Sequence, residues 1–133
     1  MAENQVQVQN LIQEIPVTQA IEKLTEELKK YGINVTYINI RGLTEIIIHM
    51  PKNIEMPIYT GFTGIIEYNN VNIHFDRTTC IFSVLFKDNG IVYEFKDVIP
   101  LYEDGNVLKI FACYLSKAVT YDTNKIIDVL LTM

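Results

Sequence analysis

A chain of 133 residues is long enough for one domain with a hydrophobic core and too short for two ordinary domains. Apolar residues make up 49% and charged residues 20% of it, a composition typical of globular rather than disordered proteins. The net charge of −5 argues against non-specific binding to nucleic acids or anionic membranes, which requires a basic surface. Because the apolar stretches are short and the Gln- and Asn-rich start does not resemble a signal peptide, we expect no membrane association and a cytoplasmic location.

The first part of the chain predicts a tail followed by a helix. Residues 1–10 have the composition of a flexible tail, so we expect a single domain over residues 11–133. From Val17 to Tyr31 the apolar residues recur at steps of three and four, which predicts an amphipathic helix with one buried face. Pro16 suits the first turn of this helix, and Gly32 is the expected stop.

Three pairs of apolar runs follow, and each pair is joined by two residues that tolerate positive φ. Such short connections are typical of β-hairpins. The connecting residues are Arg41-Gly42, Asn69-Asn70 and Asn89-Gly90. The registers that these turns predict pair Tyr37 with Ile46, Ile66 with Ile73, and Phe86 with Tyr93. Since side chains alternate along a strand, each register also assigns its residues to one or the other face of the sheet.

The C-terminal part predicts helices. Asp104-Gly105-Asn106 is typical of a turn, and Val107–Val119 is interpreted as a mostly buried helix, with a strand as the alternative. Asp122 is the expected N-cap of a last helix. The predicted architecture is therefore α+β: an N-terminal helix, a six-stranded antiparallel β-meander of three hairpins, and two C-terminal helices, packed in layers.

Two histidines are the first candidates for a site. The hairpin registers place His49 and His74 on the same face of the sheet, where neighbouring hairpins in the simplest order would bring them near one another. Glu45 and Glu67 share that face, and a metal site needs three or four such ligands. Two half-exposed surface histidines explain the same pattern, so we predict no metal ion and no other cofactor.

The cysteines and the known catalytic motifs give no active site. Cys80 is predicted to point into the core with Phe82, and Cys113 lies within the apolar predicted helix, so both are interpreted as small core residues. The acidic run Glu103–Asn106 lacks the ligand spacing of a calcium-binding loop. Phosphate-binding loops, serine-hydrolase motifs and zinc-protease motifs are absent from the sequence. We therefore predict no catalytic residues and favour a protein that is not an enzyme.

The face of the sheet opposite the apolar one is unusually rich in aliphatic residues. Solvent-facing sides of antiparallel sheets are normally polar, and an apolar patch there indicates a contact surface. The residues predicted to form it are Ile38, Ile47, His49, Ile65, His74, Leu85 and Val92. Either a C-terminal helix covers this face or a partner does, most economically a second copy in a two-fold dimer.

Three hypotheses for function follow. The first is a small non-catalytic protein-interaction module that self-associates, or binds another protein, through a sheet face or edge. The second is a small-molecule-binding or enzymatic domain with a pocket between sheet and helix. The third is a virus- or mobile-element-encoded accessory protein that acts on a host protein or nucleic acid, because abundant Ile and Asn are typical of AT-rich genomes. The acidic charge makes nucleic acid the least favoured partner.

Overall fold

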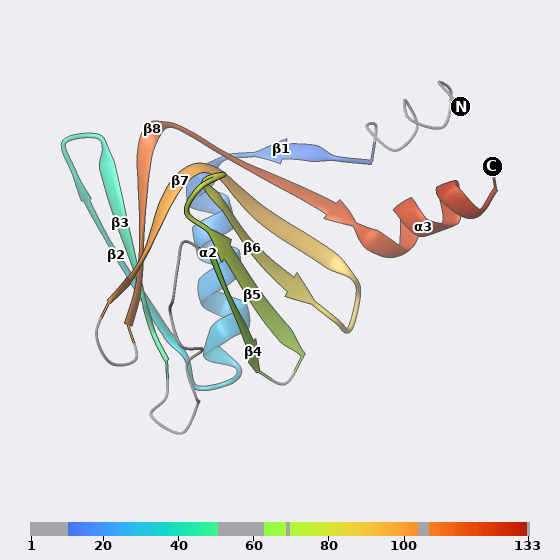
Figure 1. Cartoon of the computed structure of the whole chain (residues 1–133), viewed down its shortest axis with the longest axis horizontal. Helices are drawn as coiled ribbons and strands as arrows, with labels where there is room; N and C mark the ends of the chain where they lie inside the picture. Colours follow the sequence, from blue (N-terminus) through green and yellow to red (C-terminus); the bar gives the residue numbers. More distant parts are fainter. Residues whose placement is uncertain (1–10, 51–62, 69, 104–106, 133) are drawn as a thin grey trace.

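The chain folds into one antiparallel sheet with a helix at each end of the sequence (Figure 1). The structure is a computed structural model and describes residues 11–50, 63–68, 70–103 and 107–132. Its helices are α2 (Val17–Lys29) and α3 (Thr123–Leu131). Its strands are β1 (Gln13–Ile15), β2 (Asn34–Ile40), β3 (Leu43–His49), β4 (Thr63–Tyr68), β5 (Val71–Asp76), β6 (Ile81–Phe86), β7 (Ile91–Glu103) and β8 (Val107–Asp122).

The prediction of a six-stranded meander with two C-terminal helices is wrong. The sheet has eight strands in the order β2-β3-β8-β7-β6-β5-β4, with β1 added beside β8. The segment predicted as a helix over Val107–Val119 belongs to β8, where Leu108, Ile110 and Ala112 are buried in strict alternation. This alternation is the period of a strand, and it was hard to recognise because the apolar Phe111 lies between Ile110 and Ala112 and the exposed residues after Ala112 interrupt it. Strands β8, β7 and β6 therefore separate the first hairpin from the second, which the prediction placed side by side.

The hairpin registers are confirmed in two cases and wrong in the third. Tyr37 pairs with Ile46 in the first hairpin, and Ile66 pairs with Ile73 in the second. In the third hairpin Phe86 does not face Tyr93; Val84 does, a shift of two residues. The loop is longer because Gly90, at φ +67°, donates its N–H to the Phe86 carbonyl at 2.9 Å. An even shift leaves every side chain on its predicted face.

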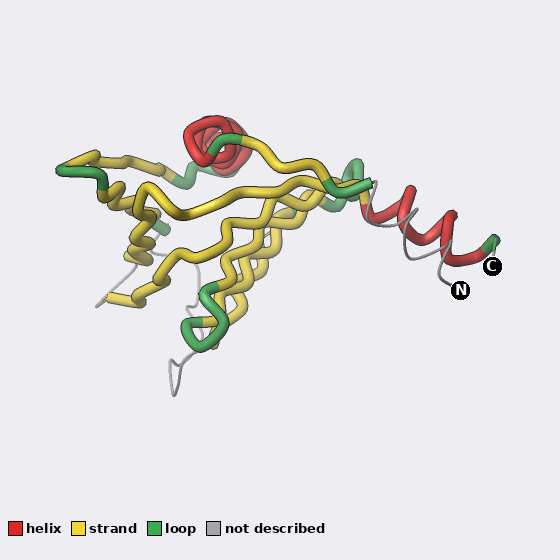
Figure 2. The backbone as a smooth tube through the Cα atoms, turned by 90° about the horizontal axis from the view of Figure 1, so that it is seen from above, coloured by secondary structure: helices red, strands yellow, loops and turns green. Residues whose placement is uncertain are grey.

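Helix α2 lies on one side of the sheet and defines its inner face (Figure 2). Its buried residues are Ala20, Ile21, Leu24 and Leu28. They belong to a core with the inward side chains of the strands, including Ile46, Ile48, Ile66, Ile73, Phe75, Phe82, Val84, Phe95, Leu108 and Ile110. The rings of Phe82 and Phe95 lie 5.5 Å apart on neighbouring strands. The predicted N-terminal helix and its buried face are confirmed.

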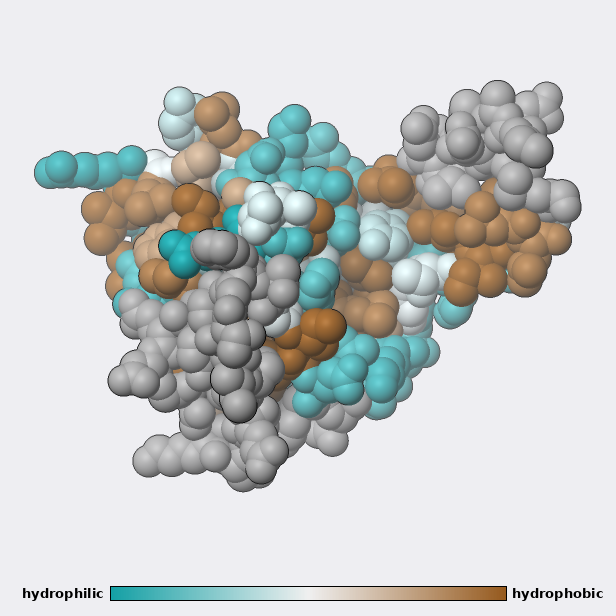
Figure 3. Space-filling model, viewed as in Figure 1, coloured by the Kyte–Doolittle hydropathy of each residue, from teal (hydrophilic) through white to brown (hydrophobic). Residues whose placement is uncertain are grey.

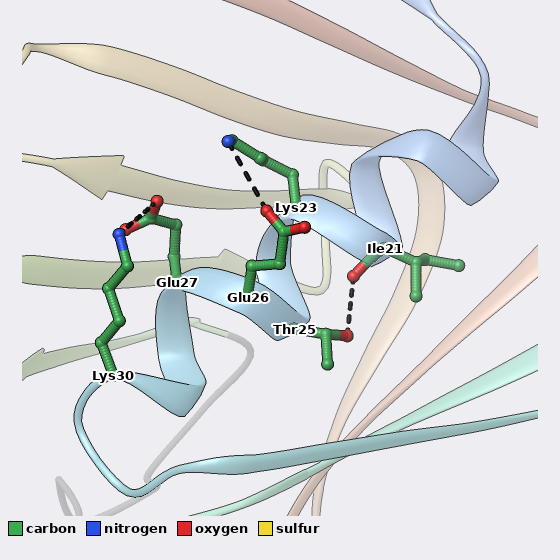
Figure 4. A network of polar contacts seen from close by, with 6 residues as sticks. All are labelled: Ile21, Lys23, Thr25, Glu26, Glu27 and Lys30. Atoms are coloured by element: carbon green, nitrogen blue, oxygen red, sulfur yellow. Dashed lines mark hydrogen bonds and ion pairs between the residues drawn. The ribbon is translucent and has the colours of Figure 1, made fainter.

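The opposite side of α2 faces solvent and carries short polar contacts (Figure 4). Lys23 lies 3.6 Å from Glu26, and Lys30 lies 3.1 Å from Glu27, both at the i, i+3 spacing. The Thr25 hydroxyl donates to the Ile21 carbonyl at 2.8 Å. Such exposed pairs contribute little to stability, so the helix is held mainly by its buried face.

Strands β7 and β8 bend together in the middle of the sheet, as the course of β8 in Figure 1 shows. Asp97 of β7 has φ +59° and interrupts the register, and residues 113–116 of β8 bulge opposite it. The buried Ser116 hydroxyl donates to the Asp97 carbonyl and accepts from the Cys113 N–H, both at 2.9 Å. Before this corner β8 pairs with β3, and after it with β1, so the sheet has a β2–β3 half and a β4–β6 half.

Helix α3 continues from β8 and projects beyond the sheet (Figures 1 and 2). The predicted cap is confirmed, since the Asp122 carboxylate accepts from the N–H groups of Asn124 and Lys125 at 2.9 and 3.3 Å. None of the α3 residues is buried. Neither described helix covers the outer face of the sheet, and neither is long and apolar enough to cross a membrane.

Candidate interaction surface

The outer face of the β2–β3 half carries exposed aliphatic side chains. The register places Ile38 of β2, Glu45 of β3, Phe111 of β8 and Ile99 of β7 in one row across the sheet. We call Ile38, Ile40, Leu43 and Ile99 the outer patch; they are 49, 60, 42 and 50% exposed. Monomeric proteins rarely leave aliphatic residues gathered in this way on one face. Hydrophobic surface lies over this end of the sheet and over α3 in Figure 3.

One ion pair lies within this surface. Glu45 of β3 and Lys109 of β8 are 3.3 Å apart, and both side chains are about three-quarters buried. Their charges offset one another. Across the strands Glu45 pairs with Phe111 and Lys109 pairs with Ile47, and both of these apolar partners are half-buried. The outer patch is therefore apolar and carries no net charge of its own.

The outer face of the β4–β6 half has an ordinary polar character. The Ser83 hydroxyl donates to the Glu94 carboxylate at 3.3 Å, and Lys96 lies 3.9 Å from the same carboxylate. Partial burial and the neighbouring Glu94 carboxylate raise the pKa of Tyr121 above its usual value. The two halves of the outer face thus differ in chemistry, and only the β2–β3 half resembles a contact surface.

The seven residues predicted to form an interaction face all lie on the outer face, but in two groups. Ile38, Ile47 and His49 are on β2 and β3, and the others are on β4, β5, β6 and β7, beyond β8. Those others are Ile65, His74, Leu85 and Val92. Val92 is only 6% exposed and Leu85 is half-buried, so neither offers much surface to a partner. The structure does not bring the seven together.

The two histidines are far apart. Strands β8, β7 and β6 lie between His49 on β3 and His74 on β5, so four strand-to-strand steps separate the two residues. They also lie at different positions along the strands, since His49 is in register with Glu103 of β7 and His74 with Glu94. The expected approach is wrong because the meander order is wrong. Among the described residues no group of three or more His, Cys, Asp or Glu is placed to hold a metal ion. The acidic run Glu103–Asn106 falls outside the part of the chain whose side chains are described.

Both cysteines differ from their predicted core positions. Cys80 is half-buried and closes the turn before β6 with φ +56°, and Cys113 is exposed at the corner of β8. Both are free thiols. Hydrogen bonds from the Leu115 backbone and the Ser116 hydroxyl lower the pKa of Cys113 below its usual value, with the hydroxyl 3.7 Å from the sulfur. Cys113 is therefore the more accessible thiol, at the margin of the outer patch beside its cross-strand partner Leu43.

Ile99 of the outer patch was missed at the sequence level. No strand beyond the third hairpin was predicted, whereas β7 continues to Glu103. Tyr37 lies on the inner face opposite Ile46, yet it is 54% exposed because β2 is at the edge of the sheet. Every second residue points inward in both strands: Val98 and Pro100 in β7, and Leu108 and Ile110 in β8. This alternation is the signal that would have revealed the longer strands.

An open hollow of about 420 Å³ lies near the start of α3. Its lining includes Ile15, Tyr93, Thr120 and Lys125, from β1, β7, β8 and α3. The size suits a small ligand, although the hollow opens widely to solvent.

Comparison of the chain with family models, with curated proteins and with solved structures finds no match.

Proposed function

We propose that this protein is a small non-catalytic interaction module that self-associates through the β2–β3 half of its sheet. The supporting observation is the outer patch, four aliphatic side chains that are each more than 40% exposed on a face that no described helix covers. Burying apolar surface is the main driving force of protein association, so such a patch favours a partner.

A second copy is the most economical partner. In a two-fold dimer the same surface meets itself, so one patch supplies both sides of the interface. The chain carries a net charge of −5, which opposes close approach of two copies where their charges face each other. The four residues of the outer patch are uncharged, and the neighbouring Glu45 and Lys109 form a neutral ion pair, so this surface adds little repulsion of its own. We further propose a cytoplasmic location, for which the two free thiols are suited.

The hollow beside α3 favours a second candidate, a small-molecule-binding domain. Tyr93 and Thr120 provide hydroxyl groups there, and Lys125 provides a cation. A ligand that co-purifies with the protein and is displaced in a Lys125→Glu variant would support this candidate.

The proposal is tested by measuring molar mass with light scattering over a wide dilution series. We expect a dimer at high concentration, and weaker association for Ile38→Lys, which places a charge in the outer patch. Ile65→Lys is the matched control, since Ile65 is a comparably exposed isoleucine, at 56%, on the outer face of the other half. A wild-type protein that remains monomeric at every concentration would contradict the proposal.

A further inference from the structure

Strand β2 is an edge of the sheet that lacks the usual protection. It is the last strand in the order, and β3 is its only partner among the described strands. Its sequence NVTYINI contains no charged residue and no proline, and its seven residues pair with β3 without a bulge. Natural sheets normally protect long edges by one of these devices, because an open edge pairs with other strands.

The other edges of the sheet are less suited to pairing. Strand β4 has six residues, among them the charged Glu67 and the conformationally weak Gly64. Strand β1 has only three residues. Strand β2 also has exposed side chains on both of its faces, with Tyr37 on the inner side and Ile38 and Ile40 on the outer side. The unprotected edge is therefore continuous with the outer patch.

The hairpin register determines which backbone groups of β2 point away from the sheet. Ile40 and Leu43 flank the two-residue turn and hydrogen-bond to one another across it. Since hydrogen-bonded and non-bonded pairs alternate along an antiparallel ladder, the even-numbered residues of β2 bond to β3. The N–H and C=O groups of Val35, Tyr37 and Asn39 accordingly face outward.

We propose that β2 pairs antiparallel with β2 of a second copy about a two-fold axis at Tyr37, so that the two sheets become one continuous sheet. This inference rests on the proposed self-association and specifies its contact. An antiparallel strand is complementary to itself under two-fold rotation, and the absence of charge on β2 removes like-charge repulsion between the two strands.

The axis at Tyr37 is chosen because it uses all of the outward groups. Tyr37 then faces Tyr37 of the second copy, and Val35 faces Asn39 in both directions. Each of these pairs exchanges two hydrogen bonds. An axis at Thr36 or Ile38 would pair one end of β2 with residues outside the strand, Ile33 or the turn residue Arg41, whose φ is +51°. The Tyr37 register also places the two tyrosine rings together across the axis, a favourable aromatic pair.

The contact between the two β2 strands is small, so we expect a weak dimer. Tyr37 leaves on the order of 100 Å² for burial at its exposure of 54%. A standard interface buries about 800 Å² on each partner, which one strand and its few exposed side chains do not reach. The dimer should therefore dissociate on dilution.

The test removes one outward N–H while leaving the hairpin intact. Asn39→Pro loses a donor that faces away from β3, and proline is tolerated on an edge strand at such a position. We expect its dimer dissociation constant, measured by light scattering on dilution, to rise at least about tenfold. Asn39→Ala keeps the N–H and is the matched control. Leu131→Lys, at the exposed end of α3, is the control for association through that helix.

The outcomes separate this inference from the proposed function. Dimers in the wild type, Asn39→Ala and Leu131→Lys, but not in a folded Asn39→Pro protein, support it. Undiminished association of Asn39→Pro, or loss of association in Leu131→Lys, overturns the β2 contact while self-association stands. A monomeric wild type overturns both. Circular dichroism and thermal unfolding of the monomeric fraction check that Asn39→Pro folds.

Cross-linking tests the position of the axis. In a background with Cys80 and Cys113 replaced by serine, Tyr37→Cys should form a disulfide with its own copy, because paired residues lie about 5.5 Å apart at Cα. Thr36→Cys should not, since its own copy is a diagonal neighbour roughly 7–8 Å away. A cross-link from Thr36→Cys and none from Tyr37→Cys would overturn the register.

Discussion

At the scale of single residues, the sheet depends on the absence of a side chain at Gly64. This glycine pairs with Phe75 across β4 and β5, and the buried Phe75 ring occupies the space above it. A Cβ atom at position 64 would lie 2.8 Å from Cε1 and 2.9 Å from Cε2 of that ring. Such distances require the ring or the strand to move. The glycine is therefore a packing requirement rather than a turn signal.

Gly64→Ala should lower the free energy of unfolding by about 1–3 kcal/mol, because the added methyl group overpacks a filled core. Urea denaturation measures the change. The same substitution in a Phe75→Leu background should cost less, since the smaller side chain leaves room for the methyl group. Equal costs in both backgrounds would contradict the packing argument.

A second residue-scale prediction concerns Cys113. Hydrogen bonds from the Leu115 backbone and the Ser116 hydroxyl lower its pKa, so a larger fraction is thiolate near neutral pH. In a Cys80→Ser protein, the pH midpoint of iodoacetamide alkylation at Cys113 should therefore lie below that of a free cysteine peptide. Adding Ser116→Ala should raise the midpoint toward the peptide value. A midpoint at or above the peptide value would show that these hydrogen bonds do not stabilise the thiolate.

At the scale of elements, the sequence was most informative where chemistry is local. The turn at Arg41-Gly42, the helix from Val17 and the cap at Asp122 each depend on neighbouring residues, and all three were predicted. The strand β8 was not, because its exposed residues Cys113, Tyr114 and Leu115 break the alternation at the corner. A corner depends on the opposing strand, and no local pattern reveals it.

Ser116→Ala should destabilise the protein by about 1–3 kcal/mol, because the Asp97 carbonyl loses the donor, and the Cys113 N–H the acceptor, that the buried Ser116 hydroxyl provides. Thermal and urea unfolding measure this cost. Ser83→Ala is the control; its half-buried hydroxyl contacts Glu94 on the outer face, and its loss should cost about 0.5 kcal/mol. A smaller effect at Ser116 than at Ser83 would mean that the corner does not depend on this hydroxyl.

At the scale of the whole molecule, the two helices have unlike roles. Helix α2 contributes four buried residues to the core, whereas α3 contributes none. The proposed interaction surface was only partly predictable for a related reason. Assigning residues to faces requires only alternation, and the seven predicted residues do lie on the outer face. Joining them into one patch requires the order of the strands. The long-range pairing of β3 with β8 sets that order, and it separated Ile38 from Ile65.

Two leucines distinguish the helices experimentally. Leu28→Ala in α2 should cost about 2–5 kcal/mol, because the residue is fully buried and a cavity remains. Leu131→Ala in α3 should change the free energy of unfolding by no more than about 0.5 kcal/mol, since its side chain is 77% exposed. Comparable costs for the two would show that α3 packs as firmly as α2.

The position of β8 between β3 and β7 has a consequence for synthesis on the ribosome. The β2–β3 hairpin emerges early, but its neighbour in the sheet is translated near the end of the chain. At roughly 5–20 residues per second, the nascent hairpin waits a few seconds for that neighbour. Throughout this interval both margins of the hairpin are available to other nascent chains, and non-local pairing of this kind is intrinsically slow. If the protein self-associates as proposed, the first copies that it meets are those being synthesised on the same polysome.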